Sequence, residues 1–215
     1  MIKAVIFDLD GLMIDSERFH FKAYKKFLSK FNVVFNIENY IPYFGVSDAD
    51  ISIDLINKFK LPITKEELME KKNKIFKSSF IKKVTLKRGL LNLLKKLHKN
   101  NYSLAVASSS HIDEIKTILS SLKISHFFKS IISVDFIKDG KPAPDIFLLA
   151  AKNLNIKPED CLVLEDAPGG VIAAKKAGMK CYAIPSTENK DNDFSKADRI
   201  LNSLGSVYLS IKKDS

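Results

Sequence analysis

The chain contains 215 residues with a mass of 24.2 kDa, enough for one large hydrophobic core or for one core with a smaller appendage. Apolar residues make up 46% of the sequence and charged residues 28%, a balance that excludes a disordered chain. Apolar runs stay shorter than a membrane span, and acids interrupt the N-terminus by Asp8, so we predict neither a transmembrane helix nor a secretion signal. We therefore expect a cytoplasmic protein.

The formal charge of +10 would suit a nucleic acid or an anionic membrane as partner. The lysines, however, are spread along the whole chain and form no block of the kind that binds polyanions. We interpret them as the solvated faces of helices, and we expect no nucleic-acid partner, no membrane partner and a monomeric chain. Cys161 and Cys181 lie in apolar runs without metal-ligand spacing, so we predict buried, reduced thiols.

The first predicted element is a buried strand over Ile2 to Phe7, a short run rich in β-branched residues. Asp8 and Asp10 follow it directly, with Gly11 in the turn. Carboxylates that lie two residues apart at the end of a strand face the same side, so these two should converge. A crowded pair of this kind suits nucleophilic attack with proton transfer, or the binding of Mg²⁺, although a polar turn after a strand has the same pattern.

Residues 16–83 read as a helical module. Apolar residues recur at helical spacing from Glu17 to Phe31, with Ser16 placed to cap that helix. A further helical stretch and two more helices follow, separated by a turn at Gly45 and by Pro62; they span about 37–44, 48–59 and 65–80. Thr64 and Glu67 are spaced as a capping box for the last of them.

From Arg88 onward, predicted helices and strands alternate, which indicates a parallel sheet with helices on both faces. The predicted helices span 90–98, 112–122, 144–154 and 171–177, and the predicted strands span 102–107, 130–134, 161–164 and 180–184, with a possible edge strand at 197–201. We therefore predict an α/β fold with a Rossmann-like, three-layer parallel sheet, built from residues 1–15 and 84–215. The helical module of residues 16–83 would be a cap inserted into it.

Polar residues follow successive strands of this predicted sheet, and ligands bind at the carboxyl ends of parallel strands. Besides the N-terminal acids, these residues are Ser108, Ser109 and Ser110 after the second strand, Lys141 after the third, and Glu165 and Asp166 after the fourth. Hydroxyls and helix N-termini can hold phosphate oxygens, and a lysine can neutralise a nucleophile and a developing negative charge. The acids can complete an oxygen-ligand set for Mg²⁺. Together these residue types suit phosphoryl transfer.

The order FDLDG, VASSS, GKPAPD and LEDAPGGVIAAKKAG resembles the haloacid dehalogenase-like (HAD) hydrolase superfamily, and within it the group of β-phosphoglucomutase and small sugar-phosphate phosphatases. The resemblance implies Asp8 as the nucleophile and Asp10 as the general acid and base. It implies that Ser108 and the backbone of Ser109 bind phosphate and that Lys141 balances the charge. For Mg²⁺ it implies Asp8, the carbonyl of Asp10, Glu165 and Asp166 as ligands. An acid at position 10 favours phosphate chemistry over dehalogenation.

The cap is expected to select the substrate, because caps of this family close over the strand ends. In the mutase branch, a G-V-S turn is followed by an arginine that binds a second phosphate, whereas here Gly45-Val46-Ser47 is followed by Asp48. His20 and Lys72 do match cap positions that the mutases use near the substrate. We therefore expect an Mg²⁺-dependent phosphatase of a small phosphorylated metabolite, a sugar or polyol monophosphate. A phosphomutase and a non-catalytic basic binding protein are the alternatives.

Overall fold

A computed structural model of the chain describes residues 1–43, 46–187 and 189–214. The turn predicted at Gly45, the end of the helical stretch predicted over 37–44, and Ser215 lie outside the described residues. The chain divides into two compact units. One contains Met1–Asp15 and Thr85–Ser215, and the other contains Ser16–Val84.

The first unit is built on a parallel sheet, which confirms the predicted fold class. Its strands follow the spatial order β3-β2-β1-β4-β5-β6, and each of these neighbouring pairs is parallel. The strands are β1 (Ala4–Phe7), β2 (Ser103–Ser108), β3 (Ser130–Ser133), β4 (Cys161–Glu165), β5 (Lys180–Ala183) and β6 (Arg199–Ile200). The predicted edge strand is therefore present as β6, and the N-terminal strand lies at the centre of the sheet.

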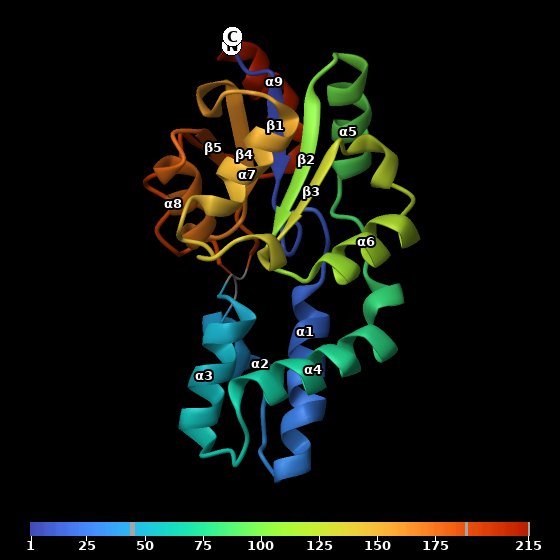
Figure 1. Cartoon of the computed structure of the whole chain (residues 1–215), viewed down its shortest axis with the longest axis vertical. Helices are drawn as coiled ribbons and strands as arrows, with labels where there is room; N and C mark the ends of the chain where they lie inside the picture. Colours follow the sequence, from blue (N-terminus) through green and yellow to red (C-terminus); the bar gives the residue numbers. More distant parts are fainter. Residues whose placement is uncertain (44–45, 188, 215) are drawn as a thin grey trace. The chain divides into compact units, whose positions relative to one another are not determined.

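Helices connect the strands of this unit, and the sheet order determines which face each helix covers. The helices are α5 (Leu90–Lys99), α6 (Ile112–Ser121), α7 (Asp145–Leu154), α8 (Pro168–Lys176) and α9 (Val207–Lys213). The chain first runs β1-β2-β3 in one direction across the sheet and then β4-β5-β6 in the other. Since parallel crossovers are right-handed, this reversal places α5 and α6 on one face and α7 and α8 on the other. Helix α7 contacts β1, β2 and β3, and α8 contacts β4 and β5; both helices are labelled in Figure 1.

Alternating side chains of the strands fix the sheet against these helices. Ala4 and Ile6 of β1 pack in one buried cluster with Phe147 of α7 and Val171 of α8. All four residues of β1 are buried, so the strand is covered on both faces, as expected for a parallel sheet. A slip of one residue would turn every side chain to the opposite face, so the register, and with it the position of each strand end, is strongly determined.

The second unit, residues 16–84, is helical, and no strand occurs among its described residues. Its α-helices are α1 (Glu17–Leu28), α2 (Ile37–Tyr40), α3 (Asp48–Phe59) and α4 (Lys65–Ser79).

The predicted capping box of α4 is confirmed: the Thr64 backbone N–H donates to Glu67 at 3.0 Å, and the Glu67 N–H donates to the Thr64 hydroxyl at 3.2 Å. The capping role predicted for Ser16 is wrong. Its backbone is in the helical region, where the side chain is not aimed at the first free N–H groups, and it makes no capping hydrogen bond.

Aromatic residues form much of the core of this helical unit. Tyr24 and Tyr40 are buried with ring centroids 5.9 Å apart, and Phe35 and Tyr40 meet edge to face at 6.4 Å. The helices are short, so their stability depends on this shared core rather than on helix propensity. Among the described residues of the whole chain, no helix has the length and apolar composition to cross a bilayer.

Candidate active site

The predicted site residues of the α/β unit meet at the carboxyl edge of the sheet, where the strand order reverses between β1 and β4. Asp8 directly follows β1, and Glu165 is the last residue of β4. Ser108 ends β2 on the other side of β1, and Lys141 lies in the segment between β3 and α7. Parallel pairing holds these strand ends level with one another, so residues far apart in sequence converge.

Lys141 joins two of these acids. Its ammonium lies 2.5 Å from Asp8 Oδ1 and 2.6 Å from Glu165 Oε1, and all three side chains are nine-tenths buried or more. Burial lowers the pKa of Lys141, but the charges of Asp8 and Glu165 outweigh burial and hold its pKa above the ordinary value. Lys141 is therefore a fixed cation at neutral pH.

The acids at this edge outnumber the cation. Burial raises the pKa of the Asp8 carboxyl well above its ordinary value; Lys141 opposes this shift, and the negative charges of Glu165 and Asp10 add to it. The site thus holds more negative charge than one ammonium balances. An additional cation would stabilise the ionised form of Asp8.

Two glycines allow the acids after β4 to approach the backbone closely. A Cβ on Gly170 would lie 1.7 Å from Glu165 Oε1, and a Cβ on Gly11 would lie 2.1 Å from Asp166 Oδ2. Gly11 also has a φ of +80°, a conformation that L side chains rarely adopt. Glu165 Oε2 accepts hydrogen bonds from the backbone N–H groups of Asp166 and Ala167 at 2.9 and 3.0 Å, which fixes the carboxylate at the start of α8.

Asp8, Glu165 and Asp166 form a set of carboxylates that fits a divalent cation. One oxygen from each lies within 4.8 Å of the others, and all three residues are buried. Ligand atoms on opposite sides of an octahedral Mg²⁺ ion are about 4.2 Å apart, so the set needs only small shifts to share one ion. Hard carboxylate oxygens are the donors that Mg²⁺ prefers. The chemistry and spacing of these donors therefore suit the predicted ion.

The hydroxyls after β2 lie beside Asp10. Ser108 is buried, and its hydroxyl lies 3.4 Å from Asp10 Oδ2. The Ser110 hydroxyl is closer and donates to the same oxygen at 2.9 Å. Ser109, between them, is exposed. The sequence showed the run of three serines but not which hydroxyl reaches Asp10, so the contact between Ser110 and Asp10 was missed.

A second residue missed by the sequence reasoning lies in the segment after β5. Asn189 is 2% exposed, and its amide donates to the backbone carbonyl of Asp166 at 2.6 Å. The Ser186 hydroxyl in turn donates to Asn189 Oδ1 at 3.2 Å. This segment thus supports the loop that carries Asp166.

Comparison with known proteins agrees with this geometry. The family model of haloacid dehalogenase-like hydrolases matches residues 5–184 of the chain, which include the whole carboxylate cluster. The chain belongs to this family. The family match confirms the predicted superfamily. Together with relatives that are named phosphatases, it also confirms the predicted enzyme class, a phosphoric monoester hydrolase of the HAD-like superfamily.

Individual relatives of the family cover most of the chain. It is 37% identical over 187 residues to a β-phosphoglucomutase of Bacillus subtilis, covering 83% of this chain and 81% of that protein. It is 30% identical over 175 residues to a fructose-1-phosphate phosphatase of Escherichia coli, covering 81% and 92% of the two chains. It is also 31% identical to the bifunctional riboflavin kinase/FMN phosphatase of Arabidopsis thaliana, with 95% of this chain covered but only 54% of that protein.

A solved structure of the family supports the fold. The crystal structure of a β-phosphoglucomutase from Clostridium difficile has a TM-score of 0.84 and 30% identity to this chain, covering 100% of this chain and 96% of that one. The α/β fold with its parallel sheet is thus the fold of this hydrolase family.

The two predicted substrate residues of the helical unit belong to a buried polar cluster within that unit. Lys72 is fully buried, and its ammonium lies 2.6 Å from Asp48 Oδ2 and 2.9 Å from His20 Nδ1. The Tyr24 hydroxyl donates to the other oxygen of Asp48 at 2.8 Å, and the His20 ring stacks on Phe76 with centroids 4.2 Å apart. The structure therefore brings His20 and Lys72 together, and Lys72 pairs with Asp48 of helix α3.

Asp48 is ionised in this cluster. Burial raises its pKa, but the charges of Lys72 and His20 and the hydrogen bonds from Lys72 and Tyr24 outweigh burial and lower the pKa below its ordinary value. Its negative charge is balanced inside the unit by Lys72. The acid at position 48 is therefore less repulsive to an anion than its sequence position alone suggests, and Lys72 is already engaged by it.

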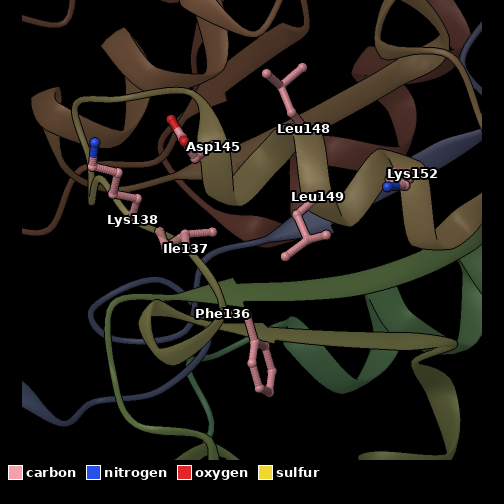
Figure 2. Close-up of a pocket in the computed structure, with 7 residues that line it drawn as sticks. All are labelled: Phe136, Ile137, Lys138, Asp145, Leu148, Leu149 and Lys152. Carbon is pink, nitrogen blue, oxygen red and sulfur yellow. The ribbon is translucent and has the colours of Figure 1, made fainter.

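The α/β unit also has a pocket of about 380 Å³ along α7, which Figure 2 shows in close-up. It is lined by Phe136, Ile137, Lys138, Asp145, Leu148, Leu149 and Lys152. None of the predicted catalytic residues lines it. The pocket is therefore separate from the carboxylate cluster, and we assign the chemistry to the cluster.

Proposed function

We propose that this hydrolase is an Mg²⁺-dependent phosphatase that cleaves a small phosphorylated metabolite, a sugar or polyol monophosphate, through a phosphorylated Asp8. The observation that carries the proposal is the buried ammonium of Lys141, held 2.5 Å from Asp8 and 2.6 Å from Glu165. A carboxylate nucleophile needs a fixed positive charge nearby to stay ionised and to accept a phosphoryl group that carries negative charge.

Each residue of the site has a role in this reaction. The Asp8 carboxylate attacks phosphorus opposite the leaving oxygen, and Asp10 gives its proton to that oxygen as the bond to phosphorus breaks. Water then attacks the phosphorus of this group and gives a proton to Asp10, while the bond from phosphorus to the Asp8 oxygen breaks. Inorganic phosphate leaves, and Asp8 is again a carboxylate. Lys141 stays charged throughout and neutralises the transferred group, and Ser108 and the backbone of Ser109 bind its oxygens.

The acids after β4 complete the site. Asp8, Asp166, the carbonyl of Asp10 and Glu165, directly or through water, would hold the Mg²⁺ ion. When bound, this ion supplies positive charge against the oxygens of the transferring phosphoryl group. Glu165 has a further role in this chain: it holds Lys141 in place with one oxygen and is itself fixed by two backbone N–H groups on the other.

The choice of phosphatase over mutase rests on the helical unit, which we propose to be the substrate-selecting cap. A mutase must hold a second phosphate, and position 48 carries an acid whose partner is the buried Lys72. The phosphomutase alternative is supported by the relatives named β-phosphoglucomutase. We propose His20 and Lys72 as cap residues that contribute to substrate selection through this cluster. The monomeric state, the cytoplasmic location and the lack of a nucleic-acid partner stay predictions.

The experiment compares Asp8→Asn with Asp113→Asn, which makes the same change at an exposed acid in the first turn of α6. Hydrolysis of 4-nitrophenyl phosphate should require Mg²⁺, stop with EDTA, and fall about 10³-fold or more in Asp8→Asn while Asp113→Asn stays near wild type. Full activity of Asp8→Asn would refute the proposal. A panel of sugar and polyol monophosphates then identifies the substrate, and conversion of hexose 1-phosphate to 6-phosphate without phosphate release would favour the mutase.

A further inference from the structure

Ser110 contacts both of the residues that handle protons and phosphate in the proposed reaction. Its hydroxyl donates to Asp10 Oδ2 at 2.9 Å, and its backbone N–H donates to the Ser108 hydroxyl oxygen at 3.0 Å. The second contact uses Ser108 as an acceptor, so the single proton of Ser108 remains available for an acceptor such as Asp10 or a phosphate oxygen. One residue thus influences the orientation of two functional groups.

The backbone of Ser110 is held by the neighbouring strand. Ser133, the last residue of β3, is fully buried. Its hydroxyl lies 2.7 Å from the Ser110 carbonyl oxygen and 3.0 Å from Asp135 Oδ2, so these two acceptors share the one proton of the Ser133 hydroxyl. Asp135 also accepts a hydrogen bond from the Ile112 backbone N–H at 2.8 Å, at the start of α6. The segment between β2 and α6 is therefore held by the end of β3 and the residues after it, at Ser110 and at Ile112.

We propose that Ser110 is a positioning residue for Asp10, and that its hydroxyl holds the carboxyl group in the orientation needed to protonate the leaving oxygen. This inference rests on the proposed function. A carboxyl group rotates freely about its terminal bond unless one oxygen is held, and a general acid acts only when its proton lies in hydrogen-bond reach of the leaving group. The hydrogen bond to Oδ2 limits that rotation. Ser133 contributes indirectly, because it fixes the backbone from which the Ser110 hydroxyl reaches Asp10.

The test uses two substrates of nearly the same size, phenyl phosphate and 4-nitrophenyl phosphate. Phenol is a poor leaving group that needs a proton from the enzyme, with a pKa of about 10 like that of tyrosine, whereas 4-nitrophenol is far more acidic and needs little help. The ratio kcat/KM reports the step in which the leaving group departs. Ser110→Ala should lower kcat/KM for phenyl phosphate about 10-fold or more and for 4-nitrophenyl phosphate less than about 3-fold. Ser110→Thr, which keeps a hydroxyl, should restore most of the loss.

Two further variants keep the test decisive. Ser133→Ala removes the support of Ser110 without touching Asp10, and it should give the same selective loss at smaller size. Ser121→Ala removes a hydroxyl that donates to a backbone carbonyl at 2.8 Å near the end of α6, and it should leave both substrates unchanged. Equal losses on both substrates, or no loss, in a folded Ser110→Ala protein would overturn the positioning role. Failure of the proposed function would look different, because the wild-type enzyme itself would then lack activity that depends on Asp8.

Discussion

Replacement of Lys141 by methionine tests the electrostatic basis of the site. Methionine keeps the unbranched stem, and the lysine ammonium already lies 5.0 Å from the Phe147 ring centroid, so an apolar end can be accommodated. The variant leaves Asp8 and Glu165 buried without their shared cation. Removing one partner of a buried ion pair typically costs about 3–5 kcal/mol, which corresponds to a fall in Tm of roughly 6–20 °C for a chain of this size. The cost should be largest at a pH where the Asp8 carboxyl is ionised.

The pH dependence of this loss has a definite sign. Burial raises the pKa of Asp8 in the folded protein above its unfolded value of about 3.9, so the folded state binds a proton on Asp8 more readily than the unfolded state. The free energy of unfolding therefore falls as the pH rises through the interval between the unfolded and the folded pKa of Asp8. Without Lys141 the pKa of Asp8 rises further, and the interval widens. The difference in stability between variant and wild type should therefore be largest above the folded pKa of Asp8. It should shrink as the pH falls below the folded pKa of Asp8, because the Asp8 carboxyl then becomes neutral in both proteins.

Thermal unfolding followed by circular dichroism in EDTA, from pH 4 to pH 8, measures this effect. Lys138→Met, an exposed lysine three residues earlier in the same loop, is the matched control and should change Tm by less than about 2 °C. Excess Mg²⁺ should recover part of the loss in Lys141→Met, because a cation that binds only the folded site stabilises it. A Lys141→Met protein as stable as wild type at pH 7, or a loss that does not depend on pH, would refute the reasoning.

Two other predictions test the surroundings of the site and the helical unit. Gly170→Ala places a methyl group 1.7 Å from a carboxylate oxygen of Glu165 and should reduce phosphatase activity about 10-fold or more. The control Gly169→Ala, whose added methyl group has no atom within 4 Å, should keep activity and raise Tm slightly. Equal activity of the two variants would contradict the close approach of Glu165 to Gly170. Asp48→Asn leaves the buried Lys72 without its carboxylate partner and should destabilise the helical unit by about 3–5 kcal/mol in denaturant unfolding. The control Asp50→Asn changes an exposed acid in the same helical turn and should cost less than about 1 kcal/mol. Similar costs for the two variants would contradict the buried ion pair of Lys72 and Asp48.

The parts of the fold that the sequence predicted well are those in which one strong local signal determines the structure. The strand β1 followed from a short β-branched run, and helix α3 has the predicted bounds, Asp48–Phe59, because Ser47 caps it by accepting from Asp50. The parallel sheet followed from alternation of helices and strands. The convergence of the acids followed from one physical rule, that the ends of parallel strands share an edge.

The sequence could not predict contacts that depend on side-chain direction. Ser110 and Ser108 have equal chemistry, and only the turn after β2 decides that the Ser110 hydroxyl lies nearer to Asp10. Asn189 stands in a polar segment without any periodicity, so nothing marks its amide as the donor to Asp166. Helix α9 was missed for a related reason: it is only seven residues long, too short for a periodic pattern to stand out from its polar neighbours.

The charges of the site explain why a phosphorylated substrate and a divalent cation would have to bind together. Asp8, Glu165 and Asp166 lie together, Asp10 adds negative charge beside Asp8, and the ammonium of Lys141 is already shared by Asp8 and Glu165. A phosphate brought to this cluster alone would meet more negative charge than positive charge. A divalent cation reverses that balance locally, and the buried surroundings strengthen its effect because water screens it poorly there. The excess of acids would thus couple the affinity for the ion to the affinity for the phosphate.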